Sequence, residues 1–181
     1  MAFNIGEYEK LIDGFHKIMQ ENIEIADIKL SADRWTLKEM VSHLIDSASN
    51  NHQRFIRLQL EAKISFPLYE AESWKNATKI GGYNAINLIN LWKEYNYFLL
   101  HIIKNIDDES QKHIWEIGNE RKTLKYLVED YFSHINWHTE LYQKRVDEIK
   151  RLNSARFAFS ILWSEAPFSR HSCTSQSFLL D

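Results

Sequence analysis

The sequence predicts an all-α protein, an up-down four-helix bundle with long crossover loops. Two observations lead to this fold class. Apolar side chains recur every three or four residues along four long segments, which is the period of one face of an α-helix. Only five glycines and two prolines occur among 181 residues, so few positions favour turns. Four amphipathic helices bury their apolar stripes most simply by packing into one bundle.

The first predicted helix spans residues 4–24, and the second begins at the sequence RWTLKEM and continues to residue 61. Thr36 and Glu39 have the spacing of a capping box at the start of the second helix. In such a box the threonine side chain accepts the glutamate backbone N–H, and the glutamate side chain accepts the threonine N–H. The pair therefore predicts where this helix starts.

The third predicted helix spans residues 83–105 and the fourth spans residues 123–152. The connection before the third helix, residues 64–82, is long for a loop in a compact domain, which favours a functional role for it. The sequence HIWEIGNERKTL, which precedes the fourth helix, predicts a short hairpin that turns at Gly118 and Asn119.

The domain organisation is predicted as one bundle, residues 1–153, followed by a C-terminal tail, residues 154–181. The tail is rich in serine, and Phe157, Phe159 and Ile161 alternate in a way that favours a strand over a helix. Three interpretations stay open: a segment that packs on the bundle or on a partner subunit, a disordered end, or residues foreign to the natural domain.

Charge and composition exclude several classes of function. The net charge is −3 and no basic stripe accompanies the aromatic residues, so we expect no nucleic-acid partner and no anionic membrane partner. No apolar run approaches the roughly 18 residues of a membrane span, and the N-terminus lacks the pattern of a signal peptide. A single cysteine, Cys173, permits no intramolecular disulfide. Together these observations predict a cytoplasmic protein.

Two histidines of the fourth helix lie on its apolar stripe. His134 and His138 continue the spacing of Leu127, Tyr131 and Leu141, so they are predicted to point inward. Residues four apart on a helix lie one above the other, and two imidazoles placed this way can share a metal ion. The pair is a weak motif in a chain with eight histidines, because a core histidine satisfied by one hydrogen bond is the more common explanation.

A polar stripe runs beside the apolar stripe of the second helix. It contains His43, Ser47, Asn50 and Arg54 at spacings of three and four, which suggests that it lines a cavity. If the helices bring His43 to the two histidines of the fourth helix, three imidazoles can surround one divalent ion. Such a site leaves a coordination position open, as catalytic sites do. Ligation by nitrogen alone suits zinc, nickel or copper, and affinity does not discriminate among them.

These motifs resemble the DinB/YfiT-like superfamily of four-helix bundle proteins over residues 5–152. The likeness rests on the Trp35 that precedes the second helix, on HLIDS in that helix, on HINWH in the fourth helix, and on the Tyr69 to Trp74 segment YEAESW. The resemblance is strongest to YfiT-like metal-dependent hydrolases. One departure is Ala71, which stands where an acidic residue often follows the tyrosine of the family motif.

The resemblance implies that His43, His134 and His138 are the metal ligands and that the ion is nickel or zinc. It also implies a homodimer and a small-molecule substrate. Some similar proteins are thiol S-transferases that use bacillithiol or a related low-molecular-weight thiol.

Three residues of the second helix are candidates for a catalytic or binding role. Asp46 is predicted either to orient an imidazole N–H or to be an exposed helix acid, and Asn50 and Arg54 either to bind a polar or anionic substrate group or to make interhelical contacts. The sequence therefore leaves three functions open. They are a metal-dependent hydrolase or thiol S-transferase, a non-catalytic metal-binding or stress-associated dimeric bundle, and a bundle whose histidines are core groups without metal.

Overall fold

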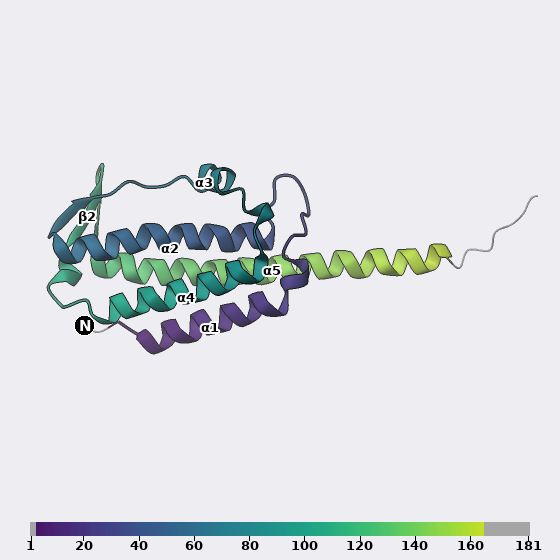
Figure 1. Cartoon of the computed structure of the whole chain (residues 1–181), viewed down its shortest axis with the longest axis horizontal. Coiled ribbons are helices and arrows are strands. Elements are labelled where there is room, and N and C mark those ends of the chain that lie inside the picture. Colours follow the sequence, from purple (N-terminus) through teal and green to yellow (C-terminus); the bar gives the residue numbers. More distant parts are fainter. Residues whose placement is uncertain (1–2, 165–181) are drawn as a thin grey trace, which may run out of the picture. The chain divides into compact units, whose positions relative to one another are not determined.

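Four long helices build the protein in the computed structural model, which describes residues 3–164. Helix α1 (Ile5–Glu21) is followed by α2 (Leu37–Leu60), α4 (Ala85–Lys104) and α5 (Leu124–Ser164) (Figure 1). The bundle and its small sheet form one compact unit that ends at Ile149. Four long helices were predicted, and their bounds agree with the sequence at seven of eight ends to within about three residues, which is close to the ordinary uncertainty of helix ends.

Helix α4 packs against both α1 and α2. It runs antiparallel to α1, because Tyr97 donates to Asp13, whereas Asn90, which is earlier in α4, contacts His16, which is later in α1. It also packs against α2 and runs parallel to it (Figure 1). The side chain of Lys38 at the start of α2 donates to the carbonyl of Tyr83 just before α4.

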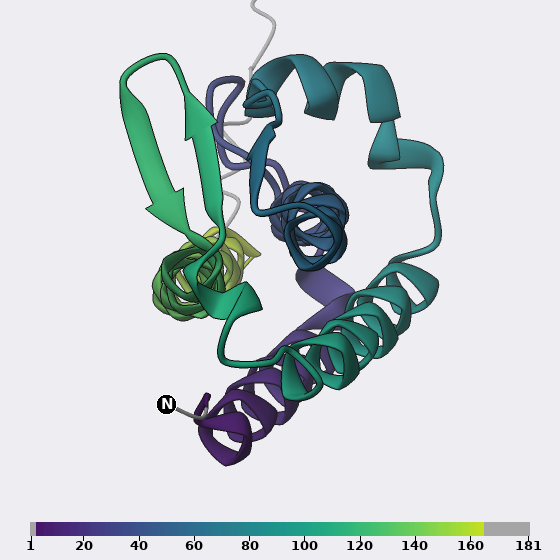
Figure 2. The same cartoon turned by 90° about the vertical axis from the view of Figure 1, so that its left-hand side faces the viewer.

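Helix α5 closes the bundle on the side opposite α4 (Figure 2). It runs parallel to α1, since Tyr8 stacks on Phe132 and Phe15 meets Tyr142 further along both helices. The four helices therefore run up, down, down and up. The alternating up-down order predicted from the sequence holds from α1 to α2 and from α4 to α5. It fails from α2 to α4, because a long crossover brings the chain back to the end at which α2 began.

The core lies between the four helices and is filled by large aromatic and aliphatic side chains. Trp92, Phe15 and Phe55 are among the largest side chains that are fully buried. On α2 the predicted apolar stripe is buried as expected, including Met40 and Leu44. This stripe fixes the rotation of α2 about its axis, and with it the direction of the polar stripe beside it.

The start of α2 has the predicted capping box. The Thr36 hydroxyl accepts the backbone N–H of Glu39 at 3.0 Å, and the Glu39 carboxylate accepts the backbone N–H of Thr36 at 2.7 Å. The two bonds satisfy donors that a helix N-terminus otherwise leaves without partners.

The connection between α2 and α4 is structured rather than an open loop. It contains β1 (Lys63–Ser65), α3 (Ala71–Thr78) and the 3-10 turn η2 (Ile80–Gly82). Glu70, beside the Ala71 that departs from the family motif, caps α3, because its carboxylate accepts the backbone N–H of Ser73 at 2.7 Å. Helix α3 lies over α2, on the side of α2 away from α1 (Figures 1 and 2).

A three-stranded sheet corrects the expectation of an all-α protein. Strands β2 (Ile114–Ile117) and β3 (Glu120–Thr123) form the predicted hairpin, with Gly118 at a positive φ of 55° in its turn. Strand β1 adds to β2 in parallel, with Ile64 opposite Trp115. This pairing joins segments about 50 residues apart, so no local pattern in the sequence predicts it.

Helix α5 also continues beyond its predicted end, to Ser164. The alternating residues 157–161, which favoured a strand, are helical instead. Extending an existing helix needs no new nucleation, so a short stretch of alternating apolar residues does not outweigh continuation of the helix. The rest of the predicted tail, residues 165–181, lies outside the described part of the chain.

Candidate metal centre

Three imidazoles from two helices meet inside the bundle. His43 comes from α2, and His134 and His138 come from α5. One ring nitrogen of each lies within 4.8 Å of the others. The Nε2 atoms of His134 and His138 are 3.0 Å apart, and the ring of His43 is centred 5.0 Å from that of His138. We call these three residues the histidine cluster.

The antiparallel packing of α2 and α5 allows this meeting. The capping box sets the start of α2, which places His43 about two turns into the helix. The contact of Phe55 with Tyr131, with ring centroids 5.9 Å apart, sets the register further along. Moving from Phe55 back towards the start of α2 therefore corresponds to moving forward along α5, towards His134 and His138.

Burial keeps the cluster uncharged. Loss of water contact lowers the pKa of His43 to about 4 and that of His138 to about 3, with a further lowering from neighbouring imidazoles. The pKa of His134 is also lowered by burial, against an opposing effect of Asp130. At neutral pH all three rings are thus neutral, which is the form of histidine that binds metal ions.

His138 does not behave as an ordinary core histidine. Its Nδ1 atom is buried and makes no hydrogen bond with any described residue, while its Nε2 faces another imidazole. The hydrogen-bonding partner of His138 is thus another neutral imidazole, whereas the described histidines outside the cluster that have a hydrogen bond use an amide, a hydroxyl or a carbonyl.

The donor set fits a divalent metal ion. Two nitrogen ligands of one ion, each bonded at about 2.0–2.1 Å, lie about 3 Å apart, close to the observed separation of the two Nε2 atoms. Three neutral nitrogens also leave at least one coordination position for a substrate or for water. His43, His134 and His138 are the residues that could hold such an ion.

Tyr69 lies beside the second nitrogen of His43. Its hydroxyl is 3.5 Å from Nδ1, which is the outer limit of a hydrogen bond. Burial raises the pKa of Tyr69 to about 12, so the phenol stays protonated at neutral pH. In the sequence, Tyr69 belongs to the motif YEAESW, and Asp46 was predicted either to orient an imidazole or to be an exposed helix acid. The structure has no hydrogen bond between Asp46 and an imidazole among the described residues.

The cluster is bordered by tryptophan rings. The edge of Trp35 meets His43, with centroids 5.4 Å apart, and Trp137 meets His138 at 4.6 Å. Trp137 is 56% exposed, so it forms part of the outer border of the site. Sequence reasoning missed Trp137, and its position directly before His138 is the only local signal that it borders the cluster.

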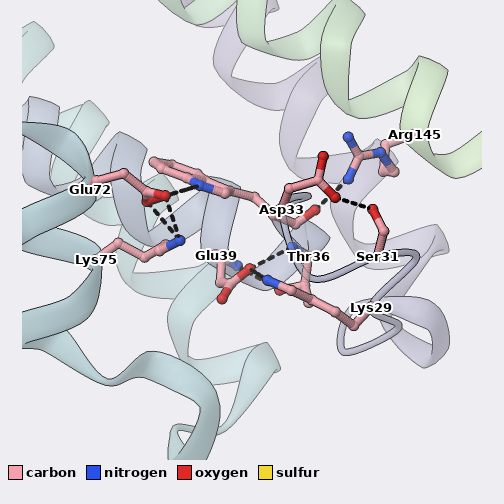
Figure 3. A network of polar contacts seen from close by, with 9 residues as sticks. Lys29, Ser31, Asp33, Thr36, Glu39, Glu72, Lys75 and Arg145 are labelled. Carbon is pink, nitrogen blue, oxygen red and sulfur yellow. Dashed lines mark hydrogen bonds and ion pairs between the residues drawn. The ribbon is translucent and has the colours of Figure 1, made fainter.

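A network of polar contacts holds Trp35 and α3 in place (Figure 3). The indole N–H of Trp35 donates to the carboxylate of Glu72 in α3, and Glu72 pairs with Lys75. On the other side, Arg145 of α5 donates to the backbone carbonyl of Trp35. These contacts connect α3, α5 and the segment before α2 around one end of the histidine cluster.

Arg54 and Asn50 lie further along the same stripe of α2. Arg54 is buried, donates to Asn51 and to the carbonyl of Pro67, and lies 5.2 Å from the Trp115 ring. Its Nε–H is buried and makes no hydrogen bond with a described residue. Asn50 uses its amide N–H on a backbone carbonyl one turn earlier, which leaves its side-chain oxygen as an acceptor.

Comparisons with known proteins bear on the fold. No family model matches the sequence, and no curated protein matches it either. The solved structure of YfiT from Bacillus subtilis is similar, with a TM-score of 0.68 and 16% identity over 81% of this chain and 87% of that one. That protein is described as a probable metal-dependent hydrolase with an unusual four-helix bundle topology. The resemblance to YfiT-like proteins is thereby confirmed at the level of the fold.

Within residues 3–164, no helix is both long and apolar enough to cross a bilayer.

Proposed function

We propose that this protein is a metal-dependent enzyme whose ion is held by His43, His134 and His138. The observation that carries the proposal is the convergence of three neutral imidazoles, with one ring nitrogen of each within 4.8 Å of the others. When bound by three histidines, a divalent ion lowers the pKa of a bound water or thiol and so supplies a nucleophile at neutral pH. The reaction is therefore of the hydrolase or thiol S-transferase type.

Arg54 and Asn50 are proposed to bind a polar or anionic group of a small-molecule substrate. The guanidinium of Arg54 supports this role, because its planar donor fork matches the geometry of a carboxylate or phosphate. The α-carbons of His43 and Arg54 are separated by eleven residues, or about 16 Å along the helix. A substrate that contacts both must be elongated, and a conjugate of a low-molecular-weight thiol has that shape.

Further details of the proposal come from the resemblance and from the composition. We propose zinc or nickel as the ion, a homodimer as the assembly, and the cytoplasm as the compartment, which the single cysteine supports. The role of Asp46 in orienting an imidazole stays a prediction, since Tyr69 is the group beside His43.

Elemental analysis of the purified protein by mass spectrometry tests the metal site. We expect close to one zinc or nickel ion per chain in the wild type and none in the variant with His134→Ala and His138→Ala. His52→Ala is the matched control, because His52 also lies on α2 but its Nδ1 is hydrogen-bonded to the hydroxyl of Tyr95. Absence of metal from the wild type after reconstitution would contradict the proposal.

Assays on the metal-loaded protein then test catalysis. Thiol transfer from low-molecular-weight thiols and hydrolysis of esters and amides are measured on the wild type and the double variant. Turnover that disappears with the metal supports an enzyme. Stoichiometric metal without turnover across both reaction types would favour the non-catalytic metal-binding bundle.

A further inference from the structure

A cavity of about 480 Å³ lies on another face of α2, between α2, the η2 turn and the start of α4. Its walls are partly apolar, formed by Ile45, Leu88 and Leu91. Asp46 is the acidic residue of its lining. None of the three clustered histidines lines it, so we treat it as separate from the metal centre and call it the Asp46 cavity.

The volume of the Asp46 cavity is typical of small-molecule sites, which occupy about 300–1,000 Å³ and combine apolar walls with few polar groups. The single acidic group of the lining determines what charge such a ligand can carry. An anion would be repelled, and a neutral ligand would leave the carboxylate without a partner.

Asp46 has no partner within the described part of the protein. No described side chain or backbone N–H forms a hydrogen bond or ion pair with its carboxylate. Burial raises its pKa to about 6, so the group is still mainly ionised at neutral pH. A partly buried charge without a counter-ion is unfavourable, and a bound cation would remove that cost.

Lys79 is the cation among the described residues that line the cavity, and it does not pair with Asp46. Its backbone has a positive φ of 50°, which a residue with a side chain seldom adopts. This conformation ends α3 and turns the chain into η2, which forms one border of the cavity. The exposed lysine side chain is thus a potential competitor for the carboxylate.

We infer that the Asp46 cavity binds a small ligand that has an apolar body and one ammonium group, with the ammonium beside the carboxylate. The apolar body contacts the walls formed by Ile45, Leu88 and Leu91. This site is additional to the metal centre and does not need a bound metal ion. It is an alternative to the predicted role of Asp46 in orienting an imidazole.

The test compares 2-phenylethylamine with 2-phenylethanol, which has the same shape and no charge. Binding is followed by NMR chemical-shift changes of leucine and isoleucine methyl groups. We expect the amine to bind the wild type with a dissociation constant in the millimolar range, roughly as for ligands of this size, and at least fivefold more tightly than the alcohol. Asp46→Asn should abolish this preference.

Three further variants locate the site. Lys79→Ala should strengthen binding of the amine, because it removes the competing cation. Leu91→Trp should weaken both probes by filling the cavity. Glu94→Gln removes an exposed carboxylate elsewhere on α4 and should change neither affinity.

An amine can also coordinate a metal ion, so the titration is repeated on the variant with His134→Ala and His138→Ala. Unchanged binding there is expected, and it keeps this inference distinct from the metal centre. Equal affinities for the two probes, a preference that survives Asp46→Asn, loss of amine binding in the double histidine variant, or no binding to the wild type would each overturn the inference.

Discussion

Helix α2 presents polar side chains on two faces, and the two differ in what the neighbouring helix contributes. On the face towards α5, His43 lies beside two further imidazoles, and one ring nitrogen of each of the three residues lies close to the others. On the face towards α4, Asp46 meets aliphatic side chains and has no counter-ion among the described residues. The difference teaches that a polar residue on a helix becomes part of a multidentate site only if the facing helix supplies matching ligands.

The remaining described histidines with hydrogen bonds sharpen this lesson. His16 contacts Asn90, His52 contacts the hydroxyl of Tyr95, and His113 contacts a backbone carbonyl. Each has the single partner that an ordinary structural histidine needs. The histidine cluster differs because its rings face one another.

The largest expected effect comes from removing the proposed metal ion from the histidine cluster. An ion present at about 1,000 times its dissociation constant stabilises the folded state by about 4 kcal/mol. For a chain of this size that corresponds to a decrease of about 10 °C in the unfolding midpoint when a chelator is added. Calorimetry with and without chelator measures the decrease.

Two variants separate the cluster from the rest of α2 in that experiment. His43→Ala should make the midpoint insensitive to chelator, whereas His52→Ala should keep the response of the wild type. Equal unfolding midpoints of the wild type with and without chelator would contradict a stabilising metal ion at the histidine cluster.

A smaller effect on stability is expected at Arg54, which lies further along the polar stripe of α2. Arg54→Ala removes a buried side chain that packs on Trp115 and holds the carbonyl of Pro67, and should cost about 2 kcal/mol of stability. Arg54→Lys should recover only part of this, since an ammonium lacks the planar donor fork. Urea unfolding gives the free energies, and the metal content should stay that of the wild type. Loss of metal in Arg54→Ala would mean that the two ends of the stripe are structurally coupled.

Both faces depend equally on the start of α2. Thr36→Ala deletes the capping box and should reduce the free energy of unfolding by about 1 kcal/mol. Ser133→Ala is a control, because its exposed hydroxyl bonds only to a carbonyl of its own helix, and the change should be within about 0.5 kcal/mol. Chemical denaturation measures both. A Thr36→Ala protein as stable as the wild type would show that packing alone sets the start of α2.

The smallest effect concerns the pH dependence of the Asp46 face. The folded state holds the Asp46 proton more tightly than the unfolded state, because burial raises its pKa to about 6 from 3.8. The stabilising contribution of this group is therefore complete below about pH 4 and is lost as the pH rises through 6.

Asp46→Asn should accordingly be more stable than the wild type at pH 7, and the advantage should disappear in acid. Because Asp46 is half-exposed, the difference should be less than about 1 kcal/mol. Urea unfolding at pH 4, 5, 6 and 7 measures it. A difference that does not vary with pH would mean that the carboxylate is well solvated.

Much of the fold could be predicted from local patterns. The helical period and the capping box gave the four helices, and the glycine turn gave the hairpin, because these signals act between residues close in sequence. Strand β1 and the parallel direction of α2 and α4 could not be predicted, since both depend on where a long crossover returns. The end of α5 was missed because an alternating segment followed a helix that simply continues.

For the candidate site, the sequence by itself determined which side chains are available: two imidazoles one turn apart on one helix and a third on the polar stripe of another. Only the tertiary structure decided that they meet, because the antiparallel register of α2 and α5 is set by packing between residues such as Phe55 and Tyr131. It also assigned Tyr69 to His43 and directed Asp46 into a separate cavity. A helical period fixes the direction of a side chain about its own axis, but the partner in that direction depends on how distant segments pack.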